Sequence, residues 1–163
     1  MSTSCTPEML RATQSDYQTF DALFALSSRI GATAAGGLQR LTATAEDKQI
    51  RDTFSRWLDE QGFTVRVDGI GNLFGLLSLR PDAPWLLCGS HLDSQPAGGR
   101  FDGAYGVTAG AVAILSLARQ LREQGIDAPF NLAVVSWTNE EGARFQPSLT
   151  GSAVFTKKLT LEQ

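Results

Sequence analysis

The sequence predicts an α/β fold in which a mixed sheet with one βαβ unit is flanked by helices. A helical stretch rich in Ala and Leu, residues 107–122, lies between two short apolar runs at 85–89 and 130–137. This strand–helix–strand order joins two parallel strands through a right-handed crossover. Alternating apolar residues at 63–79 indicate a further pair of strands in the same sheet.

Two helices are expected ahead of these strands. The first begins near Asp16 and ends near Gly31, and a loop covers 31–41. Its apolar stripe is Tyr17, Phe20, Phe24 and Ile30. The second has Thr44 as N-cap, Asp47 in the capping-box position and Gly62 as its stop. Its buried face repeats at i, i+4, i+7 and i+8 with Ile50, Phe54, Trp57 and Leu58.

The strand region begins with a hairpin. Residues 63–67 alternate, 68–72 form a turn, and 73–79 continue the apolar pattern. After two prolines, the run 85–89 is continuous and apolar, which is typical of a buried parallel strand. Cys88 in this run is therefore expected to be a small buried hydrophobe.

Composition excludes several classes of function. A chain of 163 residues suggests one domain, with residues 1–15 as a loosely ordered lead-in and 16–163 as the folded part. Fourteen Lys and Arg against seventeen Asp and Glu, without a basic run, give no signal for nucleic acid. The sequence contains no run of about 18 apolar residues, so no membrane span is predicted. The Ser- and Thr-rich start lacks the apolar segment of a secretory signal, so a cytoplasmic location is expected. Two cysteines are too few for a disulfide framework or a thiolate zinc site.

Polar residues follow both predicted parallel strands where the strands end. Ser90-His91-Leu92-Asp93 follows the first strand, Thr138-Asn139-Glu140-Glu141 follows the second, and Asp102 directly precedes the crossover helix. Ligands of parallel α/β sheets bind beyond the carboxyl ends of the strands. We therefore expect five groups to converge on one sheet edge: His91, Asp93, Asp102, Glu140 and Glu141.

These residue types suit a two-metal hydrolase. Neutral imidazole is a common metal ligand, and Asp93 lies on the same side of an extended segment as His91, where it can orient the ring. Asp102 has two oxygens with which to bridge two cations. Adjacent glutamates on an extended backbone point in different directions, so one can bind metal while the other acts as general base.

Each residue also has an ordinary structural explanation. A histidine after a strand is often a hydrogen-bonded loop residue, Asp102 is placed as a helix N-cap, and paired glutamates are usually solvated. The residues alone leave both interpretations open. Other mechanisms fit less well, because the chain has no Gly-x-Ser-x-Gly elbow, P-loop or dinucleotide fingerprint. A Cys–His pair would need Cys88, which lies inside an apolar strand.

Three segments, 89–96, 98–107 and 137–145, closely resemble the amidase, hydantoinase/carbamoylase family. This family includes N-carbamoyl-L-amino-acid hydrolases, allantoate amidohydrolases and ureido-acid hydrolases, within the dinuclear-metal aminoacylase and carboxypeptidase superfamily. The resemblance extends over nearly the whole chain, and the run Glu-Glu-Gly-Ala-Arg-Phe at 140–145 distinguishes this family from the peptidase branches. It implies the N-terminal portion of a zinc-peptidase-like catalytic domain.

The resemblance also implies a role for each residue. His91 is similar to a terminal ligand of one divalent metal ion, Asp102 to the carboxylate that bridges two ions, and Glu141 to the terminal ligand of the second. Glu140 corresponds to the general base and Asp93 to the partner of His91. The implied reaction is attack of a metal-bound hydroxide on a ureido or amide carbonyl, with cleavage of a C–N bond. Zinc and manganese suit this donor set comparably, and cobalt or nickel are further candidates.

The chain departs from the family in length and in histidine content. Family members are typically more than twice as long, and they carry two further histidine ligands and a lid and dimerisation domain, whereas His91 is the only histidine here. We therefore expect an incomplete catalytic domain whose full-length parent is a homodimer acting on a small ureido or amide substrate. Two alternatives stay open: the chain as given is a catalytically inert fragment or pseudoenzyme, or the parent is an aminoacylase or dipeptidase.

Overall fold

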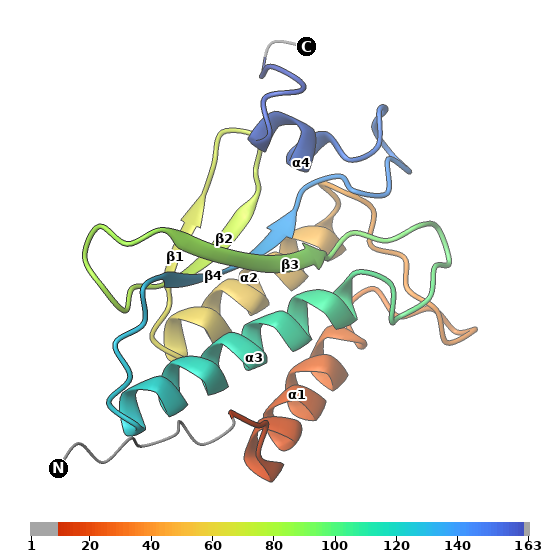
Figure 1. The fold of residues 1–163 in the computed structure, drawn as a ribbon. Coiled ribbons are helices and arrows are strands. Elements are labelled where there is room, and N and C mark those ends of the chain that lie inside the picture. Colours follow the sequence, from red (N-terminus) through yellow and green to blue (C-terminus); the bar gives the residue numbers. More distant parts are fainter. Residues whose placement is uncertain (1–9, 162–163) are drawn as a thin grey trace, which may run out of the picture.

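The computed structural model describes residues 10–161 as an α/β fold built on one four-stranded sheet (Figure 1). Four helices accompany the strands in the described part of the chain. In chain order the elements are α1 (Gln14–Ser27), α2 (Ala45–Glu60), β1 (Thr64–Val67), β2 (Leu73–Leu77), β3 (Trp85–His91), α3 (Ala104–Glu123), β4 (Asn131–Trp137) and α4 (Thr150–Phe155).

The sheet is mixed, as the sequence predicts, with strand order β1-β2-β4-β3. β1 and β2 form the expected antiparallel hairpin, and β3 and β4 are the expected parallel pair of the βαβ unit. The antiparallel pairing of β2 with β4 was not predicted, because it joins strands that are far apart in the sequence. This register sets Leu73 opposite Ser136 and fixes the hairpin beside the functional end of β4.

One face of the sheet is covered by α2 and α3, and α1 packs against α3 on the outside (Figure 1). The core lies between these helices and the sheet. Its fully buried side chains include Leu58 from α2, Val107 and Ala111 from α3, and Val134 from β4. The periodic positions Ile50, Phe54 and Leu58 of α2 are buried as expected, because a stripe at this spacing occupies one helix face.

The first helix begins at Gln14, two residues before the expected start. Thr13 is its N-cap, and Thr13 and Asp16 form a reciprocal capping box. The part of the predicted lead-in at residues 1–9, including Cys5, lies outside the described residues. The expected apolar stripe is only partly buried: Phe24 is buried, but Tyr17 is 57% exposed because it lines an open groove between α1 and α3.

The second helix has the predicted N-cap Thr44, whose hydroxyl accepts from the Asp47 amide at 3.3 Å. Contrary to the predicted capping box, the Asp47 side chain does not bond the amide of the N-cap residue. The carboxylate of Asp47 accepts from the amide of Ala43 at 2.8 Å, one residue before the cap. Asp47 thereby fixes the loop that enters the helix.

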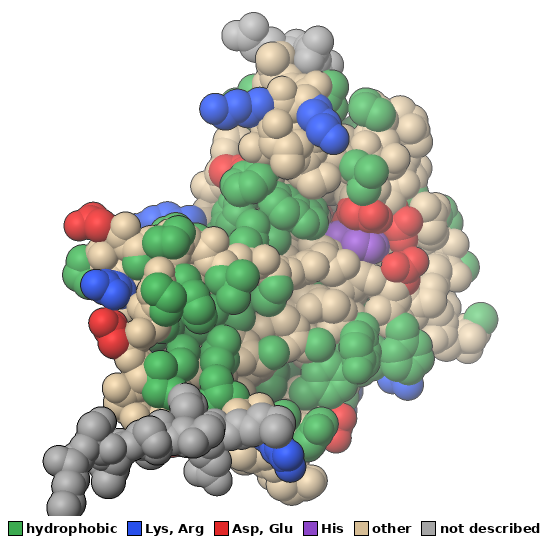
Figure 2. Space-filling view, viewed as in Figure 1, with side chains coloured by type: hydrophobic (Ala, Val, Ile, Leu, Met, Phe, Trp, Pro, Cys, Tyr) green, Lys and Arg blue, Asp and Glu red, His purple; other side chains and the backbone are tan. Residues whose placement is uncertain are grey.

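Two predictions about β3 are wrong. The strand lies at the edge of the sheet, so its side chains are largely exposed, and Cys88 is an exposed free cysteine. Trp85 and Leu86 are 46% and 52% exposed. An edge strand has a neighbour on one side only, whereas β4, with strands on both sides, is the buried one. Figure 2 shows hydrophobic side chains gathered across this view of the molecule.

The crossover helix α3 begins at Ala104, three residues earlier than predicted. This helix is long and apolar enough to satisfy the length and composition criteria for a membrane span. No such span was predicted from the sequence. Half of the qualifying window is buried inside the fold, and α3 contacts β3, β4 and α1. Its apolar residues thus form the core of the α/β unit.

The contact between α1 and α3 depends on the carboxylate of Asp16, which accepts from Ser116 Oγ at 2.8 Å and faces Arg119 at 3.2 Å. Burial raises the pKa of Asp16. Hydrogen bonds from Thr13 and Ser116 and the charge of Arg119 lower this pKa by more than burial raises it, so the net shift is downward.

We expect Asp16→Asn to reduce the free energy of unfolding by about 1 kcal/mol at pH 7. A carboxyl whose pKa is lower in the folded state stabilises the fold above its unfolded pKa and loses that contribution as the pH falls through the folded pKa. The difference between variant and wild type therefore shrinks below about pH 4. Urea unfolding followed by circular dichroism at pH 7 and pH 3 measures it, with the exposed Asp21→Asn on the same helix as control. A difference that is independent of pH would contradict the assignment.

Candidate metal centre

Three of the predicted residues come together at the carboxyl edge of the parallel strands. His91 ends β3, Asp102 precedes α3, and Glu141 follows β4. One ligand atom from each of the three lies within 4.8 Å of the others. Figure 2 shows the histidine side chain with acidic side chains around it at one side of this face. The convergence predicted from the strand order is thus present.

The side chain of His91 is 6% exposed and is surrounded by carboxylates. Its Nε2 atom lies 3.3 Å from Glu140 Oε2 and 3.6 Å from Asp102 Oδ1. Burial alone would lower the pKa of His91, but the hydrogen bonding and charge of Asp93 and the charge of Glu140 raise this pKa to about 9. The negative surroundings of Nε2 favour a cation at this position, whether a proton or a metal ion.

Asp93 holds two loops together. The Nδ1 atom of His91 lies 2.9 Å from the main-chain carbonyl oxygen of Asp93 and 3.6 Å from its carboxylate. The carboxylate accepts from the hydroxyl of Thr42 at 3.0 Å and from the amides of Glu140 and Glu141 at 3.3 Å each. Burial raises the pKa of Asp93, yet the hydrogen bond and charge of His91 lower it overall. The carbonyl orients the ring, and the carboxylate fixes the turn that carries both glutamates.

The two glutamates point to different partners, but not for the predicted reason. Residues 138–141 form a turn, not an extended segment, and Asn139 has a φ of 52°. Glu140 faces His91, whereas the carboxylate of Glu141 accepts from the side chain of Gln95 at 2.8 Å. Burial raises the pKa of Glu140, His91 lowers it, and the neighbouring acidic groups raise it, with a net upward shift. A raised pKa brings a carboxylate closer to the range useful for a general base.

Asp102 does not cap the crossover helix. Gly103 is the N-cap residue, and the Asp102 side chain is 68% exposed and faces Nε2 of His91. Gly103 has a φ of 64°, and a Cβ atom built there would lie 2.5 Å from the imidazole ring. Only glycine combines this backbone conformation with such close approach to the ring. The ordinary N-cap explanation for Asp102 is therefore excluded by its position.

Sequence reasoning missed the residues that hold the site loops. Asn72 is fully buried, donates from Nδ2 to the carbonyl of Gly151 at 2.9 Å and accepts from the amide of Thr138 at 3.0 Å. Its side chain thus ties the β1–β2 turn to the loop after β4 and to α4. The helix α4 was not predicted, because it has only six residues and no side-chain cap that would mark its start in the sequence.

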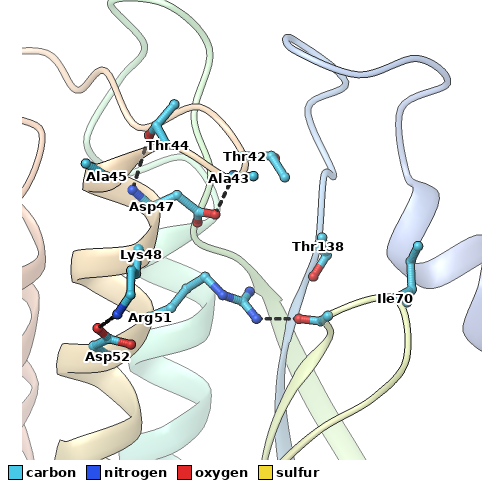
Figure 3. Close-up of a pocket in the computed structure, with 11 residues that line it drawn as sticks. Thr42, Ala43, Thr44, Ala45, Asp47, Lys48, Arg51, Asp52, Ile70 and Thr138 are labelled. Carbon is cyan, nitrogen blue, oxygen red and sulfur yellow. Dashed lines mark hydrogen bonds and ion pairs between the residues drawn. The ribbon is translucent and has the colours of Figure 1, made fainter.

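A cavity of about 570 Å³ lies behind the site, between the start of α2, the β1–β2 turn and the loop after β4 (Figure 3). Figure 3 shows Arg51 directed across it to the carbonyl of Gly71, and Lys48 paired with Asp52 along α2. None of the three clustered ligands lines the cavity. Two of its lining residues adjoin the site: Thr42, which bonds Asp93, and Thr138, which lies in the turn that carries both glutamates. The cavity and the candidate metal centre are thus separate features.

The donor set of the site fits a divalent ion. One imidazole nitrogen and two carboxylates are ligands that zinc and manganese accept. The three groups come from three separate loops, and the buried ring of His91 is fixed by a carbonyl, as is usual for metal-binding histidines. With a bridging Asp102, two ions would have two of these ligands each.

Comparison with known proteins gives the following similarities. Residues 72–163 match the model of peptidase family M28. An N-carbamoyl-L-amino-acid amidohydrolase of Rhizobium meliloti is 42% identical over 83% of this chain and 32% of its own length. An allantoate amidohydrolase of Bacillus subtilis is 37% identical over 79% of this chain and 31% of its own length. The crystal structure of a hydantoinase/carbamoylase family amidase from Burkholderia ambifaria has a TM-score of 0.82 and 47% identity, covering 95% of this chain and 37% of that one. The chain therefore spans about a third of the length of the curated relatives that it matches.

Proposed function

The chain belongs to peptidase family M28 and is similar to hydantoinase/carbamoylase amidases, and from this premise we propose that it forms the metal-binding part of a hydrolase of linear C–N bonds. The observation that carries the proposal is the convergence of His91, Asp102 and Glu141 within 4.8 Å, beside the carboxylate of Glu140. A helix cap does not explain the position of Asp102, because Gly103 is the N-cap of α3. The substrates that we propose are N-carbamoyl-L-amino acids or allantoate-like ureido acids, because relatives carry those names.

His91, Asp102 and Glu141 would hold the metal, and Asp102, with its two carboxylate oxygens, would be the ligand that two ions share. Bound divalent ions polarise a carbonyl oxygen and lower the pKa of water. Glu140 would accept a proton from the attacking water and return it to the nitrogen of the leaving group, so that the C–O bond forms as the C–N bond breaks. Asp93 would keep Glu140 and Glu141 in place through their amides.

Two divalent ions, zinc or manganese, are proposed for the full site. The chain has one histidine, and the three proposed ligands are His91, Asp102 and Glu141. Two ions would therefore have to share these three ligands. That shortage supports a second proposal, that the 163-residue chain by itself has little or no catalytic activity. Assembly as a homodimer and a cytoplasmic location stay predictions.

Calorimetric titration of the chain with zinc tests the metal centre. We expect saturable binding that is weakened at least about tenfold in His91→Ala and in Asp102→Asn. Glu123→Gln, at the opposite end of α3, is the matched control and should bind zinc like the wild type. Equal zinc affinity in wild type and His91→Ala would refute the assignment.

A substrate screen tests the reaction class. The product of the complete reading frame, loaded with zinc or manganese, is assayed with N-carbamoyl-L-amino acids, allantoate, N-acyl amino acids and dipeptides. Turnover of the ureido substrates is expected. Turnover of N-acyl amino acids or dipeptides alone would favour the aminoacylase or dipeptidase alternative, and no turnover with any metal would refute the proposal.

A further inference from the structure

Gln95 makes the most direct side-chain contact with a proposed metal ligand. It lies in the loop after β3, two residues after Asp93. Its Nε2 donates to Glu141 Oε2 at 2.8 Å, and its main-chain amide donates to Glu141 Oε1 at 3.3 Å. Both oxygens of the Glu141 carboxylate therefore receive a hydrogen bond from the same residue.

The two hydrogen bonds differ in length, and the difference selects one oxygen. The 2.8 Å contact to Oε2 has the length of a charge-assisted hydrogen bond, whereas the 3.3 Å contact to Oε1 is longer than the usual range. Oε1 is thus the oxygen whose hydrogen bond is more easily replaced by a bond to a metal ion. The side-chain amide occupies Oε2 with the shorter hydrogen bond and leaves Oε1 with the longer one.

The loop that carries Gln95 is itself fixed. The carbonyl of Gln95 accepts from the hydroxyl of Ser94 at 3.0 Å and from the amide of Gly98 at 3.1 Å. Ser94 is 3% exposed and its hydroxyl also accepts from the Arg40 amide at 2.9 Å. An exposed glutamine anchored in this way can position a partner group, whereas a free surface side chain cannot.

We propose that Gln95 is a positioning residue that makes Glu141 bind metal through one oxygen and sets the metal affinity of the site. The inference rests on the proposed metal centre. Glu141 lies on a turn and is partly exposed, so without the amide its carboxylate is free to rotate or to bind through both oxygens. Hydrogen-bonded partners of metal ligands typically change metal affinity by about 10- to 100-fold when they are replaced.

Two variants of the chain with side chains of similar size test the proposal. Gln95→Leu removes the amide donor, and Gln95→Glu replaces it with a second negative acceptor. Zinc affinity is measured by calorimetry, and the absorption spectrum of the cobalt-loaded chain reports the ligand geometry. We expect zinc binding to weaken about tenfold in Gln95→Leu and about 100-fold in Gln95→Glu, with an altered cobalt spectrum in both. Gln146→Leu is the matched control, because its amide donates to the carbonyl of Gly142 and to no proposed ligand.

The outcomes separate this inference from the proposed function. If the wild-type chain binds neither zinc nor cobalt, the metal centre itself is refuted. If the wild type binds both ions and the two Gln95 variants show the same affinity and spectrum, the positioning role alone is wrong. Lower stability in urea with unchanged metal binding would also refute it, because Gln95 would then act only as a link between two loops.

Discussion

Glu140→Gln in the product of the complete reading frame is expected to lower kcat by about 10²- to 10⁴-fold, the usual contribution of a positioned general acid–base group. Glutamine has nearly the shape of glutamate but cannot take a proton from water at neutral pH. Glu140 Oε2 lies 3.3 Å from His91 Nε2, so the lost group is at the centre of the cluster. Its amide, which bonds Asp93, is unchanged by the substitution.

The measurement is steady-state turnover of an N-carbamoyl-L-amino acid together with zinc affinity. Because Glu140 is proposed as a base and not as a ligand, zinc affinity should stay within a few-fold of wild type while kcat falls. Glu123→Gln, an exposed glutamate at the far end of α3, should leave both quantities unchanged. A large loss of zinc affinity with kcat preserved at saturating metal would show that Glu140 is a ligand instead.

Arg40→Met is expected to produce the largest loss of stability, about 3–5 kcal/mol in the free energy of unfolding. Arg40 is 1% exposed, and its guanidinium donates to the carbonyls of Leu92 at 2.8 Å, Ser27 at 2.7 Å and Ile30 at 3.1 Å. Methionine fills a similar volume but donates to none of these three carbonyls, and the Ser27 carbonyl keeps only the longer bond from the Ile30 amide at 3.3 Å. The end of α1 and the loop after β3 would lose their common anchor.

Charge adds to this effect. Burial lowers the pKa of Arg40 to about 10, while the charges of Asp47 and Asp93 raise it, so the side chain stays protonated at neutral pH. Its removal takes away a positive charge from the buried carboxylates of Asp47 and Asp93, which keep only Arg51 and His91, respectively, among the charges that lower their pKa. Urea unfolding followed by circular dichroism gives the change in stability. Arg80→Met, in an exposed ion pair with Asp127, should cost at most about 1 kcal/mol, and a similar loss in both variants would contradict the account.

Local patterns determined the three long helices α1, α2 and α3, the hairpin and the parallel pair, but not the short helix α4. The periodic face of α2, the Thr44 cap and the strand–helix–strand order each depend on residues close together in the chain. The same order predicted that the polar side chains meet, because parallel strands joined by one crossover must end at the same edge. That is why His91, Asp102 and Glu141 were predicted correctly to converge.

Strand position within the sheet was decided only by the tertiary structure. The runs that form β3 and β4 are both apolar, yet β4 is buried and β3 is an exposed edge with Cys88 accessible. The difference arises because β2 pairs with β4, a long-range contact that hydrophobic periodicity does not encode. The buried Arg40 was missed for the same reason, since its acceptors come from two segments distant in sequence.

The sequence by itself therefore determined which residues form the candidate metal centre, and the tertiary structure decided how they are held. A ligand's identity follows from its residue type and its place at a strand end. Its orientation follows from partners such as Gln95 for Glu141 and the Asp93 carbonyl for His91. Those contacts depend on loop conformations, including the positive φ angles of Asn139 and Gly103, that form only when distant segments pack together.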